Sequence, residues 1–511
     1  PIKSSAASDV YKRQIFNPVK VPVRPFIRVK WRRSNVIVEA LLKFAAWLAN
    51  ILWQTPTLLL IGTVAVVLTI GSRGFQFRRF GYIMKNTVGK LREKGAAGSG
   101  NLSPFQACCI ALASTVGTGN IAGVATAISI GGPGAIFWMW LMALLGMISK
   151  TAEVTLAVHY REKDDNGVFH GGPMYYMRKG LGWGALAKVF CVGLIVNSLL
   201  TAGLLQQHTA ARAFLSTWNI NPYITAGAMA FVCGIVIIGG LKRIGSFCEY
   251  CVPIMAIAYV LGGLVIMIVN FEKIPEVFGM IFKYAFAPAP AMGGFAGSVV
   301  ATSIQRGISR GMMSNEAGQG SAPMAHATAA IDHPVEQGVW GAFEVFVDTI
   351  IVCSISAFVI LSTGVLESGL SGVDLVLAGF DTVFPGTIAS MLLSFAIITF
   401  CLSSQIGFYW YAETAVHDLT NGNQKAINAF KWIFLIPGVA CAGVDNVYAL
   451  WNVADIATAL TSIPNLIAVA ALAGVFFKLL KDCESGERKY ATAITDNTRH
   501  YIREPKAKTN S

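Results

Sequence analysis

A long apolar stretch over residues 105–130 is interrupted at its centre by residues that do not favour a helix. Its length would let one helix cross a bilayer. Residues 116–120 nonetheless read VGTGN, and each glycine costs about 1 kcal/mol relative to alanine inside a helix. Backbone groups freed at membrane depth persist only where protein buries them or a wet cavity receives them. The stretch therefore indicates either a binding site at open helix ends or close packing of helices through small residues.

The rest of the chain repeats the apolar pattern. Of its 511 residues, 54% are hydrophobic and 13% are charged, whereas soluble domains are about 25% charged. Successive apolar segments predict an all-α polytopic membrane protein with eleven transmembrane helices. We expect these spans over residues 55–70, 105–130, 131–158, 185–206, 223–238, 250–269, 291–308, 338–363, 386–411, 429–442 and 454–479.

Basic residues set the expected orientation. The formal net charge of +13 is typical of cytoplasmic loops that contact lipid headgroups, and we expect no nucleic acid as a partner. The loop 71–104 is rich in lysine and arginine and is expected inside, which places the C-terminus in the cytoplasm and the N-terminus outside. The basic residues of 1–34 oppose this orientation, but the many later loops outweigh them. The ten cysteines lack zinc-ligand spacing and are expected to be reduced packing residues.

The spans suggest an organisation in five parts. Residues 1–34 form a basic segment that is foreign to the native protein or disordered, and residues 35–104 hold an interfacial helix, one additional span and the basic loop. Residues 105–270 and 271–480 are expected to be two five-helix repeats of opposite orientation, followed by a basic cytoplasmic tail over 481–511. The second repeat has its own Gly- and Pro-rich stretch at 288–298, which predicts a second interrupted helix. Paired interruptions at corresponding positions indicate the site of a secondary transporter.

A small zwitterion and a cation fit these parts chemically. The backbone N–H groups near Thr118 and Gly119 could hold a substrate carboxylate at a half-helix N-terminus. A sodium ion needs hard oxygen ligands, which the freed carbonyl groups and one amide side chain could supply. These sodium candidates are Ala113, Thr115, Val116 and Asn120.

Three further polar residues lie inside apolar spans. Asp348 is in the middle of the span 338–363, where an ionisable group is a functional hypothesis by default. A buried aspartate that is only protonated or hydrogen-bonded is the alternative. Ser403 and Ser404 offer hydroxyl oxygens to a cation, although back-bonding within their own helix would also explain them.

Other classes of function fit the sequence less well. Residues 307–311 match the G-x-S-x-G pattern of hydrolases, but that pattern needs a strand–turn–helix context, so we do not expect an enzyme. A channel would need pore-lining rings, usually in a symmetric oligomer, and the sequence does not indicate an oligomeric state. Proton coupling with Asp348 as the relay remains open beside sodium coupling.

Residues 131–146 resemble the signature of the alanine or glycine:cation symporter family, the sodium:alanine symporters. The segments 115–124, 314–323 and 462–466 resemble further blocks of that family in the same order. The resemblance implies a protein of a bacterial-type inner cell membrane that takes up alanine, glycine or a similar small neutral amino acid with Na⁺, or with H⁺. It also implies a LeuT-like fold with a five-plus-five inverted repeat and one extra N-terminal helix.

Residues 117–120 are also similar to the Gly-x-Gly-Asn break of neurotransmitter:sodium symporters. Carried over, this implies that the amides of Thr118 and Gly119 hold the carboxylate beside Asn120. One sodium site would use the carbonyls of Ala113 and Val116 with Ser403 and Ser404, and the other would use Thr115, Asn120 and Asp348. The remaining substrate contacts implied are Gly294, Phe295 and Ser298 from the sixth core helix and Phe408 on the far wall. Around Gly407 the family pattern has a Trp and small residues, whereas this chain has Gln405, Phe408, Tyr409 and Trp410, so the preferred side-chain size is open.

Overall fold

The computed structural model describes residues 43–45, 47–49, 51–53, 55–91, 100–290, 297–384, 386–444 and 447–486. The chain divides into a short unit, Pro1–Phe44, and a large one, Ala45–Ser511, and the large unit is described below. All of the predicted segment 1–34, most of the predicted tail 481–511 and most of the predicted interfacial helix lie outside the described residues. The described residues 43–45, 47–49 and 51–52 are helical.

Helices make up almost all of the described structure. Up to the middle of the chain they are α3 (Thr55–Gly71), α4 (Phe75–Arg78), α5 (Phe80–Thr87), η1 (Val88–Lys90), α6 (Pro104–Thr115), η2 (Gly119–Gly123), α7 (Val124–Gly131), α8 (Ala135–His159), α9 (Pro173–Leu181), α10 (Gly184–Asn197), η3 (Ser198–Gln206), α11 (Gln207–Trp218), α12 (Pro222–Ile238) and α13 (Gly240–Val269). They continue with η4 (Phe271–Lys273), α14 (Ile274–Phe286), α15 (Val300–Asn315), α16 (Pro323–His326), α17 (Pro334–Val345), η5 (Phe346–Cys353), α18 (Ser354–Thr363), η6 (Val365–Ser368), α19 (Gly372–Asp381), α20 (Thr387–Leu419), α21 (Gln424–Ala440), α22 (Val447–Ala471) and α23 (Ala473–Ser485).

The expectation of a multi-pass α-helical protein is confirmed. Among the described residues, six helices are long and apolar enough to cross a membrane, and the pair formed by α6 and η2–α7 adds a seventh span with a 47° bend. Two shorter apolar helices cover Pro56–Gly71 and Pro222–Ile238. The count of eleven spans stays a prediction.

One short hairpin accompanies the helices, and one predicted span has other bounds. The hairpin is formed by the antiparallel strands β1 (Glu162–Lys163) and β2 (Phe169–His170) in an otherwise helical structure. The span expected over 291–308 is displaced, because Ala289 pairs with Ser298 in an isolated bridge and α15 runs from Val300 to Asn315. The stretch 288–298 thus lies between α14 and α15, and residues 291–296 of it lie outside the described part of the chain.

The second interruption lies after α15. The chain leaves the helix at Glu316, whose φ of 55° is left-handed, and Gly318 and Gly320 follow with φ of 94° and 79°. A Cβ on Gly320 would come within 2.7 Å of the Asn465 side chain, so both conformation and space require glycine there. The unwound stretch then enters the single turn of α16.

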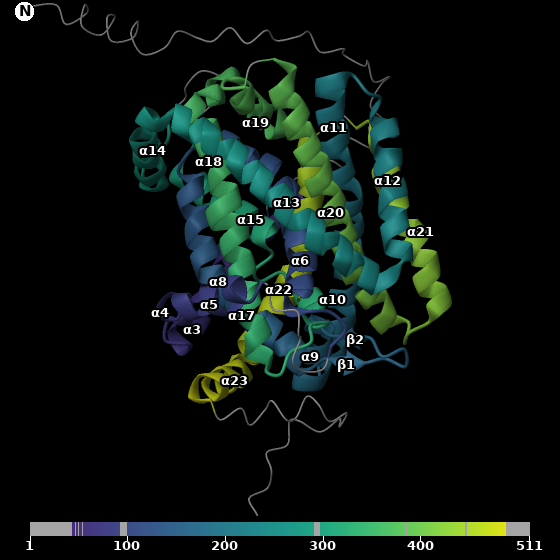
Figure 1. The fold of residues 1–511 in the computed structure, drawn as a ribbon. Coiled ribbons are helices and arrows are strands. Elements are labelled where there is room, and N and C mark those ends of the chain that lie inside the picture. The colour runs from purple at the N-terminus through teal and green to yellow at the C-terminus, as the bar shows by residue number, and fades with distance from the viewer. Residues whose placement is uncertain are drawn as a thin grey trace, which may run out of the picture. The chain divides into compact units, whose positions relative to one another are not determined.

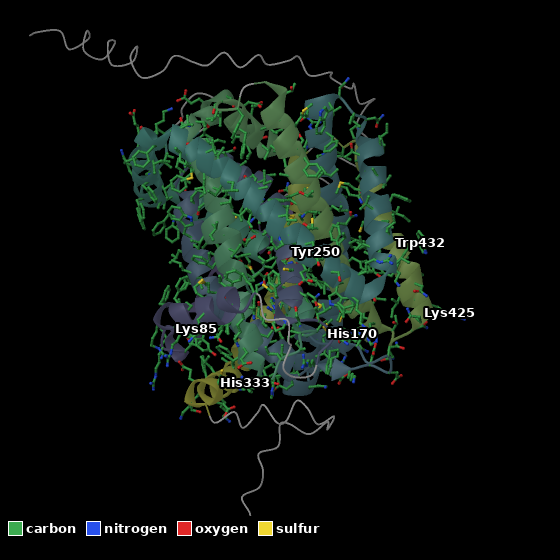
Figure 2. The ribbon with its side chains drawn as sticks, viewed as in Figure 1. Lys85, His170, Tyr250, His333, Lys425 and Trp432 are labelled. Carbon is green, nitrogen blue, oxygen red and sulfur yellow. The ribbon has the colours of Figure 1, made fainter. Side chains whose placement is uncertain are left out.

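The helices pack as one bundle with two distinct ends. α8 lies along α15 and α17, and the buried Lys150 of α8 is 3.2 Å from Glu344 of α17. α14 and α19 lie at one end of the bundle, and α9, the β1–β2 hairpin and α23 lie at the other (Figure 1). Figure 2 shows Lys85, His170, His333 and Lys425 toward this second end, while Trp432 points outward from α21.

Candidate functional site at the broken helix

Local sequence explains where the first broken helix begins and ends. Ser103 accepts a hydrogen bond from the backbone of Gln106, and the Gln106 side chain accepts one from the backbone of Ser103. This capping box, with Pro104 at the first helical position, starts α6. Val116 is extended, with φ −78° and ψ 92°, and ends α6 before the wider turns of η2. The break at 116–119 is therefore encoded by its residues, as expected.

Side-chain oxygens accept hydrogen bonds from the freed backbone N–H groups. The Asn120 side chain reaches back so that its Oδ1 accepts from Gly117 N at 2.8 Å. Thr118 N donates to Gln206 Oε1 at 3.2 Å. The Gln206 amide thus supplies an oxygen where the sequence predicts a substrate carboxylate, and Thr118 is 2% exposed. The break is closed to solvent in this conformation.

A buried carboxylate lies directly against the break. Asn120 Nδ2 donates to Asp348 Oδ1 at 2.7 Å and to the Asp348 carbonyl at 3.1 Å. The hydroxyls of Ser314 and Thr349 each donate to Asp348 Oδ2 at 2.8 Å. Because an ionised carboxylate only accepts hydrogen bonds, this ring of donors suits a charged Asp348. A cation beside the Asp348 carboxylate would neutralise its negative charge.

The predicted sodium ligands are only partly brought together. Ser404 Oγ lies 3.4 Å from the Val116 carbonyl oxygen, which joins two members of the first predicted site. Ser403 instead donates to its own helix at Phe400 O, 2.9 Å away. Thr115 likewise donates to Ala111 O at 3.2 Å. Ala113 is fully buried in α6, and both sodium sites stay predictions.

The predicted substrate contacts outside the break are not brought together at the break in the described residues. Gly294 and Phe295 lie outside the described residues. Ser298 donates to the Gly131 carbonyl at 2.8 Å, at the C-terminal end of α7 rather than at the break. Phe408 is 3% exposed and packs edge-on against Tyr411, with ring centroids 5.5 Å apart. The Tyr411 hydroxyl is in turn hydrogen-bonded to Ser114 of α6.

Sequence reasoning missed Gln206 and Ser314. A Cβ on Gly119 would come within 3.1 Å of Ser314 Cα, so the end of α15 lies against the first break. Ser314 belongs to the block 314–323, which carries the resemblance but was given no role. Asn120, Gln206 and Asp348 each lie in a π-helical stretch, namely η2, η3 and η5. Such wide turns occur frequently at functional sites, but sequence does not reveal them.

Comparison with known proteins identifies the family of the chain. The profile described as the sodium:alanine symporter family matches residues 38–497. The chain belongs to this family. It is 37% identical over 460 residues to YflA, an uncharacterized transporter of Bacillus subtilis, covering 89% of this chain and 96% of that protein. It is 37% identical over 435 residues to the sodium/alanine symporter AgcS of Methanococcus maripaludis, covering 83% and 93%.

The fold is that of LeuT-like transporters. The crystal structure of MhsT in complex with L-phenylalanine aligns with a TM-score of 0.51 at 14% identity, covering 79% of this chain and all of that one. As a member of the sodium:alanine symporter family, the chain is a transporter and not an enzyme. The G-x-S-x-G pattern agrees with this, because Gly307 and Ser309 lie within α15 and not on a strand–turn–helix elbow.

Proposed function

We propose that the protein is a Na⁺-coupled symporter that carries small neutral amino acids such as alanine or glycine into the cell by alternating access. The observation that carries this proposal is the contact of Asn120 with Asp348 at the break of a family member's first core helix. An amide and a carboxylate supply hard oxygens, which suit an alkali cation, and the half-helix N-terminus suits a carboxylate. Asn120, which contacts Asp348, is two residues from Thr118 at the start of this half-helix.

The close packing of the break supports a small substrate. A Cβ on Gly117 would lie 2.2 Å from Ser404 Oγ, and one on Gly119 would lie 3.1 Å from Ser314 Cα. Atoms therefore fill the space on both sides of Thr118. A short side chain such as a methyl group or hydrogen needs the least rearrangement there, because overpacking is costly.

The assignment of ions and substrate follows the predicted sets. Thr118, Gly119 and Asn120 would bind the substrate together with Gly294, Phe295, Ser298 and Phe408. One sodium site would use Ala113, Val116, Ser403 and Ser404, and the other Thr115, Asn120 and Asp348. The two repeats, 105–270 and 271–480, would rock against each other around this region, as in other transporters with paired broken helices.

The decisive experiment is radiolabelled uptake by the purified protein in proteoliposomes. An inward Na⁺ gradient is expected to drive accumulation of alanine or glycine, with larger amino acids such as glutamine and phenylalanine competing weakly. No concentrative uptake of any small neutral amino acid under this gradient would overturn the proposal. Uptake that persists without Na⁺ and collapses with a protonophore would instead establish proton coupling, with Asp348 as its relay.

A further inference from the structure

A chamber of about 490 Å³ is lined by residues outside the broken helix. It lies between the residues before α3, the first turns of α15 and the start of α22. Trp47 and Trp53 line one side, Arg306 and Ser309 of α15 line another, and Asn452 and Asp455 of α22 close it. Tryptophans beside the start of a span are typical of the membrane–water interface.

Two polar groups of this chamber have no partner within the described part of the chain. The Nε of Arg306 and the Oγ of Ser309 are buried and make no hydrogen bond there. Ser309 is 2% exposed and lines the chamber. A buried polar group without a partner costs about 1–3 kcal/mol, and a cation costs more. Such an arrangement persists most readily where a ligand supplies the missing acceptor.

The acidic residue of the chamber attracts the charge of Arg306 but is hydrogen-bonded to a different arginine. Asp455 is engaged by Arg310, whose two terminal nitrogens lie 2.6 and 3.0 Å from its two carboxylate oxygens. A bidentate pair of this kind satisfies both charges. The guanidinium of Arg306 therefore leaves the chamber with an excess positive charge, which favours an anion.

We propose that this chamber binds an oxyanion, with Arg306 and Ser309 as its ligands. Two sources carry that chemistry. One is the phosphate of an anionic phospholipid, which fits the volume and the tryptophans. The other is the carboxylate of an amino acid on its way to the break, since Arg306, Arg310 and Ser314 follow one face of α15 over about 12 Å. This second source rests on the proposed transport function, whereas the first does not.

The test measures thermal stabilisation of the detergent-purified protein by dioleoyl phosphatidylglycerol and, separately, by alanine with Na⁺. Arg306→Gln removes the unpaired charge without stranding a partner, so the variant is expected to fold. The apparent affinity of the oxyanion source is expected to fall about tenfold in Arg306→Gln and by less in Ser309→Ala. Arg243→Gln, which removes a cation of α13 that does not line the chamber, serves as the matched control.

The outcomes separate the two sources. Loss of stabilisation by the phospholipid in Arg306→Gln, but not in Arg243→Gln, assigns the chamber to lipid phosphate. A higher KM for alanine uptake with unchanged kcat assigns it to the substrate carboxylate. If Arg306→Gln and Ser309→Ala leave both the phospholipid response and the KM unchanged, the chamber is not an oxyanion site. Failure of the wild type to bind alanine would contradict only the proposed function, because the phospholipid measurement needs no transport.

Discussion

Asn120 and Asp348 meet through a 2.7 Å hydrogen bond although 228 residues separate them. The first lies in the π-helical turn of a broken span and the second in the π-helical turn of another. Both side chains are fully buried. Among the hydrogen bonds of the described residues, Asp348 is the only charged side chain that contacts the break. Its removal should therefore affect the break directly.

Replacing Asp348 by alanine is expected to abolish concentrative uptake of alanine. The change removes the carboxylate and leaves the donors of Asn120 and Ser314 without their acceptor, at a cost of about 1–3 kcal/mol. Uptake and the amount of protein in the membrane should be measured together. Asp381→Ala is the control, because Asp381 is exposed and accepts a hydrogen bond from Ser390 alone among the side chains of the described residues. Wild-type uptake by the Asp348 variant would remove this carboxylate from the mechanism.

Side chains added at Gly119 are expected to block transport in proportion to their size. A Cβ there meets the backbone of Ser314 at 3.1 Å, and overpacking of this kind costs about 1–3 kcal/mol. Gly119→Ala should lower the uptake rate severalfold and Gly119→Leu should eliminate it. Gly62→Ala tests the effect of the substitution itself, since a Cβ on Gly62 meets nothing within 4 Å. Normal alanine binding by Gly119→Leu would mean that the site is misplaced.

Lys150 and Glu344 are expected to stabilise the protein only as a pair. Both side chains are fully buried and lie 3.2 Å apart. Lys150→Met alone leaves the buried Glu344 carboxylate with His326, whose Nε2 is 3.0 Å from its Oε2, but without its lysine, and should cost about 3–5 kcal/mol. The double change Lys150→Met with Glu344→Leu should recover much of this loss in the melting temperature in detergent. A double variant as unstable as the sum of the singles would show that the two charges do not interact.

The packing of the β1–β2 hairpin is expected to weaken in mild acid. Burial and the neighbouring His417 lower the pKa of His170 from 6.5 to about 4, although Asp164 opposes the shift. Between pH 6.5 and 4, the unfolded chain binds a proton at His170 that the folded protein does not bind. The stability present above pH 6.5 is therefore lost as the pH falls toward 4.

Melting temperatures between pH 7.5 and 5 measure this loss. His170→Phe keeps an aromatic ring against Trp410 and His417 but removes the titration. The variant should show a shallower decline with falling pH than the wild type. Equal declines in the two proteins would assign the acid sensitivity to other groups.

The predicted orientation is testable with single added cysteines. Lys85 and Lys425 lie toward the same end of the bundle (Figure 2), and Lys283 belongs to α14 at the opposite end (Figure 1). Lys425→Cys is expected to react with a membrane-impermeant maleimide in inside-out vesicles, and Lys283→Cys in right-side-out vesicles, above the background of the native cysteines. The reverse pattern would place the C-terminus outside.

The parts of the site that sequence predicts are those that are costly in a membrane. Asn120 within a glycine break and Asp348 within an apolar span are each expensive unless they serve a function or find a partner. Gln206 and Ser314 give no such signal, because amides and hydroxyls near the ends of spans are common. Their contact with the break depends on π-helical turns and on tertiary packing.

The second break was misplaced for a related reason. Proline and glycine at 288–298 have the composition of an interrupted helix, whereas the true unwound stretch after Asn315 reads as a polar loop. Only the positive φ values of Glu316, Gly318 and Gly320, buried against neighbouring helices, identify it as part of the bundle. Composition detects residues that can break a helix, but packing decides where a break is used.

The side-chain oxygen of Gln206 accepts the hydrogen bond of the Thr118 N–H group, for which an incoming carboxylate would have to compete. Any carboxylate that takes this N–H group must first displace an oxygen held at 3.2 Å. The apparent affinity of an incoming ligand is then lowered by the fraction of time during which Gln206 occupies the place. If the substrate carboxylate binds at Thr118 as proposed, a side chain far from the break in sequence would set how readily the protein loads and releases it.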